Sequence, residues 1–322
     1  MRALRQPGLW LCVGGLLVWG LLIFFLQDPT LRETSFTLLM YVGLASSLNI
    51  LLGYTGYVSF GHIVFFGLRG YLGFYLVSVQ GWSLYPAALA GGLFCAFIAA
   101  LLGLAVLRLR GAYFALATIG VNEAARAFVS NFGPFGGATG LSLDYSVYGL
   151  YGGSMMALWL AFGLVWGIAI AVVVASYLVK QSRFGLSLMA IREDEDAAMV
   201  MGVRAPQAKT WAYALSAFFP GIIGAIYFFK NGNVEPGDAF RLHMSIETLV
   251  MIMLGGQGTI LGPILGGVAY ERLRGYLLVS PLFKSLHLAI SGVALLLIIL
   301  FVPAGAVGWL RRRFAKLRGV LE

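Results

Sequence analysis

Long apolar runs dominate the chain, and short polar or glycine-rich stretches separate them. A helix needs about 20 apolar residues to cross the hydrocarbon core of a bilayer. By that standard the runs predict spans at about residues 8–26, 36–52, 62–79, 85–107, 112–130, 156–179, 210–229, 244–256, 263–280 and 286–302. The eighth run is short and the ninth contains three charged residues, so these two fit a span least well. The pattern predicts an all-α fold, a polytopic transmembrane helical bundle of about ten spans that forms one domain over residues 1–322.

The first run is predicted to be a retained span and not a cleaved signal peptide. Its apolar core is longer than that of a signal peptide, and no small-residue cleavage site follows before Gln27-Asp28-Pro29. We therefore count it among the membrane helices.

Composition supports the membrane assignment. Of the 322 residues, 60% are hydrophobic and 11% are charged, whereas a soluble domain carries roughly 25% charged residues. The net charge of +9 is consistent with basic cytoplasmic loops, so we expect membrane lipid and no nucleic acid as a partner. The two cysteines and three histidines form no ligand spacing, and we expect no metal and no cofactor.

The distribution of basic residues orients the spans. If both termini lie inside, the inside segments contain 14 Lys and Arg residues and the outside segments contain 4. This bias follows the positive-inside rule and favours an even number of spans with both termini cytoplasmic. The terminal segment 303–322 is then a basic cytoplasmic tail at the lipid headgroups.

Two glycine-rich breaks interrupt the apolar pattern. The stretch GYTGYVSFGH covers residues 53–62, and GGQG covers residues 255–258. Irregular backbone at membrane depth must face protein or a water-filled cavity, and glycine-broken segments in two halves of a transporter indicate a substrate path. Candidate path residues in the first break are Gly53, Gly56, Tyr57, Ser59, Gly61 and His62. The alternative is that the glycines serve helix packing and that His62 is a helix cap or an interhelical hydrogen bonder.

Charged residues inside spans form a second group of candidates. Glu123 and Arg126 are spaced i, i+3 beside Asn122, so they share one helix face and are expected to face other helices. We add both to the candidate path, with a structural ion pair as the alternative. Arg69 has no acid nearby in the sequence and needs a carbonyl, an acid on another helix or the interface.

The chain contains no motif of a known catalytic centre. It lacks the P-loop pattern, so it does not bind ATP in that way, and it lacks the HExxH and Rossmann patterns. We expect no catalytic residues and a protein that is not an enzyme.

The longest inside segment, residues 180–209, contains a predicted short helix over residues 193–203. Four acids, Glu193 to Asp196, would occupy its first turn, where the helix dipole favours negative charge. Ala197, Ala198, Met199 and Met201 would form an exposed apolar patch, and Gly202 would end the helix in a left-handed cap. A helix of this kind suits docking into a groove on another protein.

Four stretches of this sequence resemble the branched-chain amino acid permease family of ABC importers, whose urea-transporting relatives share the same blocks. They are LNILLGYTGYVSFGH, LRLRGAYFALATIGVNEAARAF, AIREDEDAAMVMGV and SIETLVMIMLGGQGTILGPILGG. The third resembles the coupling loop of that family, which has the pattern E-A-A-x-x-x-G. The resemblance assigns ATPase docking to Arg192, Glu193, Asp194, Glu195, Asp196, Ala197, Ala198 and Gly202.

The resemblance implies a transport subunit in a bacterial or archaeal plasma membrane. Its implied partners are a second permease subunit of similar fold, two cytoplasmic ATPase subunits and an extracytoplasmic solute-binding protein. Tyr57 and Arg69 depart from the family pattern, and both flank the proposed path. Leucine, isoleucine, valine, other amides and urea all remain open as cargo. An ion-coupled secondary transporter, a membrane enzyme and an assembly scaffold are the alternatives outside this family.

Overall fold

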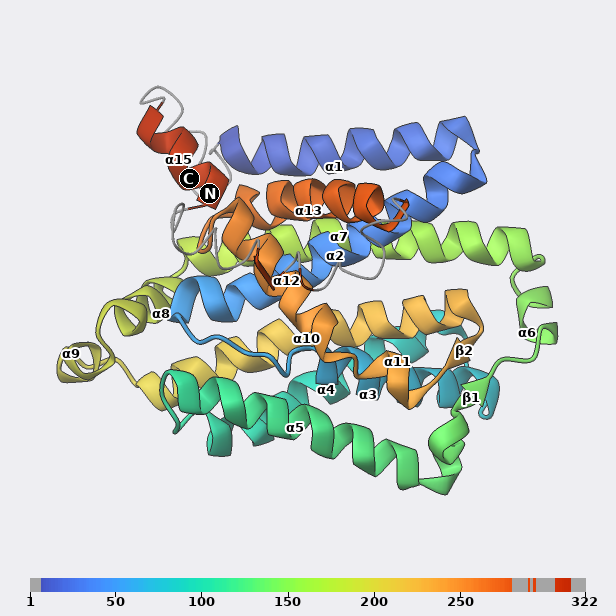
Figure 1. The fold of residues 1–322 in the computed structure, drawn as a ribbon, viewed down its shortest axis with the longest axis horizontal. Helices are drawn as coiled ribbons and strands as arrows, with labels where there is room; N and C mark the ends of the chain where they lie inside the picture. Colours follow the sequence, from blue (N-terminus) through green and yellow to red (C-terminus); the bar gives the residue numbers. More distant parts are fainter. Residues whose placement is uncertain (1–6, 280–288, 290–291, 294–304, 314–322) are drawn as a thin grey trace.

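The computed structural model describes residues 7–279, 289, 292–293 and 305–313, and these residues are predominantly helical (Figure 1). The elements in chain order are α1 (Pro7–Leu26), α2 (Pro29–Thr55), α3 (Ile63–Ser78), α4 (Leu84–Val106), α5 (Ala112–Asn131), η2 (Gly133–Phe135), η3 (Gly137–Thr139), β1 (Leu141–Ser142), α6 (Ser146–Gly149), α7 (Ser154–Gln181), α8 (Arg183–Glu193), α9 (Glu195–Val200), α10 (Ala205–Asn231), β2 (Asn233–Val234), α11 (Pro236–Ala239), α12 (Leu242–Gly255), α13 (Leu261–Val279) and α15 (Gly305–Arg313). The predicted all-α class is confirmed, because the two short strands form only one antiparallel pair.

Five of the described helices are long and apolar enough to cross a membrane: α1, α2, α4, α7 and α10. The structure therefore shows a multi-pass helical protein, whereas the predicted count of ten spans is not confirmed. α3 has 16 residues and α12 has 14, which is short for a span. Most of the tenth predicted span lies outside the described residues, as do residues 1–6 and most of the basic tail.

Burial separates central helices from peripheral ones. In the most apolar window of each helix, 89% of the residues of α2 and 83% of those of α10 are buried, compared with 28% for both α1 and α4. In a membrane the exposed apolar faces of α1 and α4 suit contact with lipid. The core is therefore built around α2 and α10.

α2 begins earlier than the apolar pattern predicts. The side chain of Asp28 caps the helix by accepting a hydrogen bond from the backbone nitrogen of Thr30 at 2.7 Å, and Pro29 occupies the first helical position. Arg32 in the first turns is only 6% exposed and lies over the ring of Trp159. The contact with the aromatic ring explains how the Arg32 cation is accommodated in the first turn of α2, which the hydropathy pattern leaves out of the predicted span.

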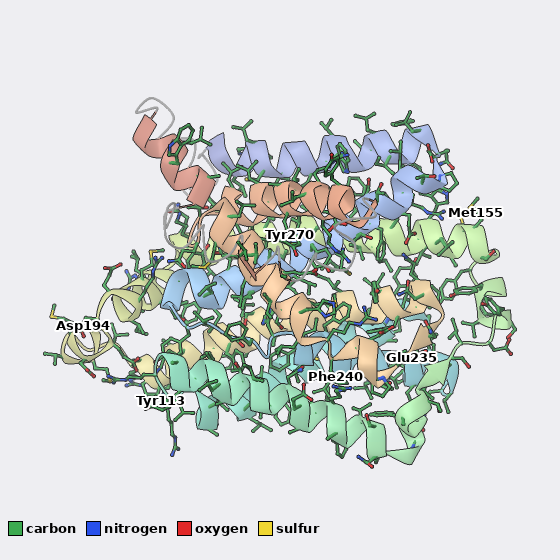
Figure 2. All side chains as sticks on the ribbon, in the orientation of Figure 1. Tyr113, Met155, Asp194, Glu235, Phe240 and Tyr270 are labelled. Atoms are coloured by element: carbon green, nitrogen blue, oxygen red, sulfur yellow. The ribbon has the colours of Figure 1, made fainter. Side chains whose placement is uncertain are left out.

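The two ends of the bundle differ (Figure 1). α8 and α9 protrude from one end, where α2, α4 and α7 finish and α5 and α10 begin. The other end carries α6, α11 and the pairing of β1 with β2, in which Leu141 lies opposite Val234. Figure 2 shows Asp194 at the protruding tip and Met155 at the opposite end.

Arg69 on α3 is fully buried against α4. Its guanidinium occupies the space above Gly91, where an added Cβ would come within 1.6 Å of Cζ. Within the described part of the chain, none of its three side-chain nitrogens has a hydrogen-bond partner. The expectation that Arg69 meets a carbonyl, an acid on another helix or the interface is therefore wrong for the described residues, and Gly91 is what makes room for the side chain.

Candidate coupling site

The protruding segment consists of two short helices joined at Asp194. The Ser182 hydroxyl caps α8 by accepting from the backbone nitrogen of Gly185 at 3.0 Å. Asp194 caps α9 by accepting from the backbone nitrogens of Asp196 and Ala197 at 2.9 and 3.0 Å. The single helix predicted over residues 193–203 is therefore wrong in its bounds. An aspartate at this position satisfies the first amides of a new helix and ends the previous one at Glu193.

The apolar patch on this segment also differs from the prediction. Ala198 is buried at 5% exposure, whereas Met199, Val200 and Met201 are exposed at 40%, 86% and 84%. Gly202 follows with a φ of +92°, the left-handed conformation expected of it. This segment thus carries an exposed apolar patch, Met199–Met201.

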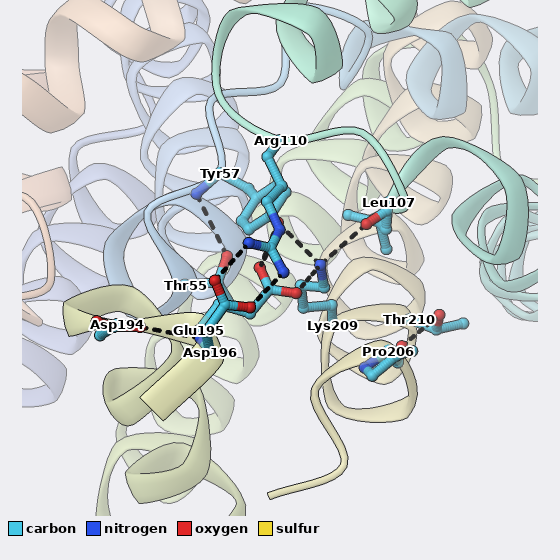
Figure 3. A network of polar contacts seen from close by, with 10 residues as sticks. All are labelled: Thr55, Tyr57, Leu107, Arg110, Asp194, Glu195, Asp196, Pro206, Lys209 and Thr210. Carbon is cyan, nitrogen blue, oxygen red and sulfur yellow. Dashed lines mark hydrogen bonds and ion pairs between the residues drawn. The ribbon is translucent and has the colours of Figure 1, made fainter. Parts of the chain in front are cut away.

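A buried lysine ties α9 to the membrane helices (Figure 3). Lys209 on α10 is 3% exposed, and its Nζ donates to Glu195 Oε1 at 2.7 Å, Tyr57 Oη at 2.8 Å and the Leu107 carbonyl at 2.9 Å. An ammonium has three protons, so these three acceptors satisfy it completely. The Tyr57 hydroxyl in turn donates to Glu195 Oε2 at 2.7 Å. We call Tyr57, Glu195 and Lys209 the latch.

Arg110 extends the latch toward solvent. Its guanidinium donates two hydrogen bonds to the Asp196 carboxylate at 2.8 and 3.0 Å, and its Nε lies 3.7 Å from Glu195 Oε2. The hydrogen bonds and charge of Arg110 lower the pKa of Asp196. Burial alone would raise the pKa of Glu195, but the hydrogen bonds from Lys209 and Tyr57, together with the charges, outweigh burial and lower it. Both acids are therefore ionised at neutral pH.

A second connection runs from α8 to the first glycine break. Arg192 Nη1 donates to the Gly53 carbonyl at 2.8 Å, and the same nitrogen lies 2.9 Å from the position of a Cβ on Gly258. Gly53 still belongs to the last turn of α2, which ends in the left-handed Gly56 with a φ of +76°. The irregular backbone therefore covers fewer residues than the sequence pattern indicates.

The two glycine breaks lie against each other. The Asn49 side chain donates to the Thr259 carbonyl at 3.0 Å and accepts from the Gly258 amide at 2.9 Å. A Cβ on Gly53 would come within 2.7 Å of the Gly258 nitrogen. The two stretches are thus in direct contact, and Arg192 lies beside that contact.

The remaining candidates of the first break are buried. Ser59 is fully buried, and a Cβ on Gly61 would lie 2.4 Å from the Thr118 carbonyl of α5. His62 Nε2 lies 3.2 Å from Ser47 Oγ, whose own proton goes to the Leu44 carbonyl, so the histidine donates through Nε2. His62 lines a cavity of about 10 Å³ together with Ser245 and Thr248. This cavity is too small to hold an amino acid.

Glu123 and Arg126 pair with each other at 3.6 Å but lie on the exposed side of α5. Thr118 and Asn122 occupy the buried side, where the Asn122 amide donates to the Phe240 carbonyl. The structure therefore does not bring the Glu123–Arg126 pair together with the first break.

Three important residues escape the sequence analysis: Asn49, Arg110 and Lys209. Asn49 sits in an apolar run four residues before Gly53, and a lone amide in such a run is a usable signal. Arg110 and Lys209 look like ordinary positive-inside charges, and nothing in the sequence separates them from the others. Among the described residues no group of three metal-ligating side chains occurs.

The sequence was compared with known proteins. Residues 31–300 match the model of a family described as branched-chain amino acid transport system, permease component. The chain belongs to this family. The match covers α2 from residue 31 onward and every described element from α3 to α13, so the latch lies inside the matched region.

Individual relatives agree with the family assignment. The chain is 28% identical to the high-affinity branched-chain amino acid transport system permease protein LivM of Escherichia coli, over 93% of this chain and 75% of the relative. The LivM protein of Salmonella typhimurium is 27% identical over 83% of this chain. The ribose import permease protein RbsC of Bacillus subtilis is 25% identical over 41% of this chain. No solved structure matches the chain.

Proposed function

We propose that this chain is the membrane-spanning permease subunit of a binding-protein-dependent ABC importer for branched-chain or related amino acids. The family match and the two LivM relatives support the cargo class. The observation that carries the mechanism is the latch, because it ties the protruding α9 to the spanning helix α10 and to Tyr57 of the first break. A second permease subunit, two ATPase subunits and a solute-binding protein complete the importer.

α9 is the part that the ATPase holds. Its exposed Met199–Met201 patch is apolar, as a helix that inserts into a groove requires. The acids beside the patch differ in whether they form ion pairs within this chain. Glu195 and Asp196 bind residues of this chain, whereas Glu193 is exposed. Of the predicted docking acids, Glu193 is thus the one best placed to meet a partner.

Movement of α8 and α9 reaches the membrane by two routes. The latch moves Tyr57 and α10, and Arg192 moves Gly53 together with the contact between the two breaks. Both routes end at the first break, where Ser59 and His62 are buried and the cavity that His62 lines measures about 10 Å³. We propose that ATP binding opens this region, which gives the path residues their role.

The end of the bundle from which α8 and α9 protrude also determines the proposed orientation in the membrane. α1 begins and α15 lies at the end from which α8 and α9 protrude (Figure 1). If an ATPase holds α9, that end is cytoplasmic and both termini lie on the cytoplasmic side of the plasma membrane. The basic residues of the loop 180–209 agree with this orientation.

The deciding experiment is uptake by the complete importer in proteoliposomes, with labelled leucine and labelled urea offered in separate assays. We expect ATP-dependent uptake of leucine and none of urea. Uptake of urea alone would replace the cargo class but keep the mechanism. Uptake by the purified chain without ATPase subunits, driven by an ion gradient, would overturn the importer assignment.

A further inference from the structure

A pocket of about 410 Å³ opens beside the latch, where the end of α4 meets α9 and the start of α10. Its walls are largely apolar and include Leu104, Leu107, Met199 and Pro206. Its cations are Arg108, Arg110 and Lys209. The pocket thus combines an apolar wall with positively charged side chains at the end of a spanning helix.

The apolar wall continues along the exposed side of α4. Leu93, Phe97, Leu101 and Leu104 are exposed at 60%, 61%, 52% and 57%, and their spacing of three or four residues puts them on one face. Leu104 belongs both to this stripe and to the pocket. An acyl chain that lies along α4 therefore leads directly into the pocket.

The charges of the pocket are not balanced. Asp196 neutralises Arg110, and Glu195 neutralises Lys209. Arg108 is exposed, and the one hydrogen bond recorded for it within the described ranges goes from Nε to the Leu104 carbonyl of its own helix. A guanidinium has five donors, so Arg108 retains four for an anion.

We propose that this pocket binds an anionic phospholipid of the cytoplasmic leaflet. The phosphate group accepts from Arg108, and one acyl chain lies on the Leu93–Leu104 stripe. A basic pocket between spanning helices on the cytoplasmic side suits an anionic headgroup. Free phosphate would leave the apolar wall uncovered, and an acidic segment of a soluble partner would leave the membrane-facing stripe uncovered.

Because the pocket adjoins the latch, a bound lipid affects the coupling between α9 and α10. Glu195 and Lys209 line the pocket and also form the latch. A bound lipid therefore fills the space between α4 and α9 and supports the contact through which α9 moves α10. The inference concerns lipid binding and does not depend on which cargo is transported.

The test compares retention of phosphatidylglycerol and phosphatidylcholine by the purified chain, measured by native mass spectrometry after solubilisation from vesicles that contain both lipids. We expect preferential retention of phosphatidylglycerol. Arg108→Gln should reduce it about fivefold, the effect of one basic residue near an anionic lipid, and Arg108→Lys should largely restore it. Arg183→Gln is the matched control, because Arg183 is exposed on α8 and does not line the pocket.

A second measurement keeps the proposal falsifiable if the variant folds poorly. Photoreactive phosphatidylglycerol bound to the unaltered chain should crosslink to residues around Leu104 and Met199. Crosslinks confined to other helices, equal retention by R108Q, or displacement of the lipid by inorganic phosphate would each overturn the proposal. Complete release of the lipid when the ATPase subunits bind would assign the surface to the ATPase instead.

Discussion

The latch depends on a single buried ammonium and the acid that neutralises it. Lys209 is 3% exposed and Glu195 is 12% exposed, so water screens the pair only weakly. By contrast, Asp196 is 68% exposed in its pair with Arg110. Removal of the Glu195 carboxylate should therefore lower the free energy of unfolding more than removal of the neighbouring Asp196 carboxylate.

We expect Glu195→Gln to lower the free energy of unfolding by about 3 kcal/mol, because it leaves the Lys209 charge buried without a carboxylate. Asp196→Asn is the matched control and should cost about 1 kcal/mol or less, as an exposed pair does. Thermal unfolding of the two variants in detergent measures the difference. Equal destabilisation by both would show that Lys209 does not need Glu195.

The same comparison has a defined pH dependence. The pKa of Glu195 is lowered from its ordinary value of 4.5, so its contribution to stability is fully present above that value and is lost as the pH falls through the lowered pKa. The stability difference between the unaltered chain and E195Q should stay constant from neutral pH down to about 5 and shrink below 4.5. A difference that already changes near neutral pH would contradict the lowered pKa.

A residue's role can be predicted from the sequence when that role depends only on its neighbours along the chain. The left-handed backbone after α9 requires a glycine, and the sequence correctly places Gly202 there. Lys209 has partners 14, 102 and 152 residues away along the chain, so only the folded structure reveals its role. Asn49 lies between these cases, since the polarity is visible but its partners at residues 258 and 259 are not.

At the scale of elements, the helix class follows from hydropathy but the bounds follow from capping. Asp28 with Pro29 starts α2 before its apolar run, and Asp194 divides the predicted coupling helix in two. The apolar pattern cannot show either event, because a cap is a property of one or two polar residues. Hydropathy alone does not fix the number of spans, since α3 and α12 are apolar but short.

The packing of α3 against α4 gives a prediction at this scale. Gly91→Ala places a methyl group where the Arg69 guanidinium lies, so the buried Arg69 side chain or one of the two helices must shift. Overpacking of this kind costs typically about 1–3 kcal/mol. Gly163→Ala on α7 is the matched control, because its added Cβ meets nothing within 4 Å.

Thermal unfolding of both variants tests this packing. G91A should unfold at a lower temperature than the unaltered chain, whereas G163A should not. A G91A variant as stable as the unaltered chain would mean that Arg69 has another place to go.

At the scale of the whole molecule, α9 is the part that we propose docks on a partner. Val200 is its most exposed apolar residue, at 86%. Placing a charge there leaves the latch intact and removes the apolar contact that a groove would bury. The variant therefore separates docking from folding.

We expect Val200→Asp to weaken association with the ATPase subunits at least tenfold, since a central apolar contact contributes about 2 kcal/mol. Leucine uptake should fall with it, and Val200→Leu should leave both unchanged. Co-purification of tagged ATPase subunits measures association. Normal association and uptake with V200D would place the ATPase contact elsewhere.

Chain order gives the latch one more consequence, for biogenesis. Tyr57, Leu107 and Glu195 all precede Lys209 in the sequence. During synthesis these partners have left the ribosome before the lysine emerges. Lys209 therefore never has to enter the bilayer as a lone cation, and insertion of α10 can proceed without waiting for the C-terminal third of the protein.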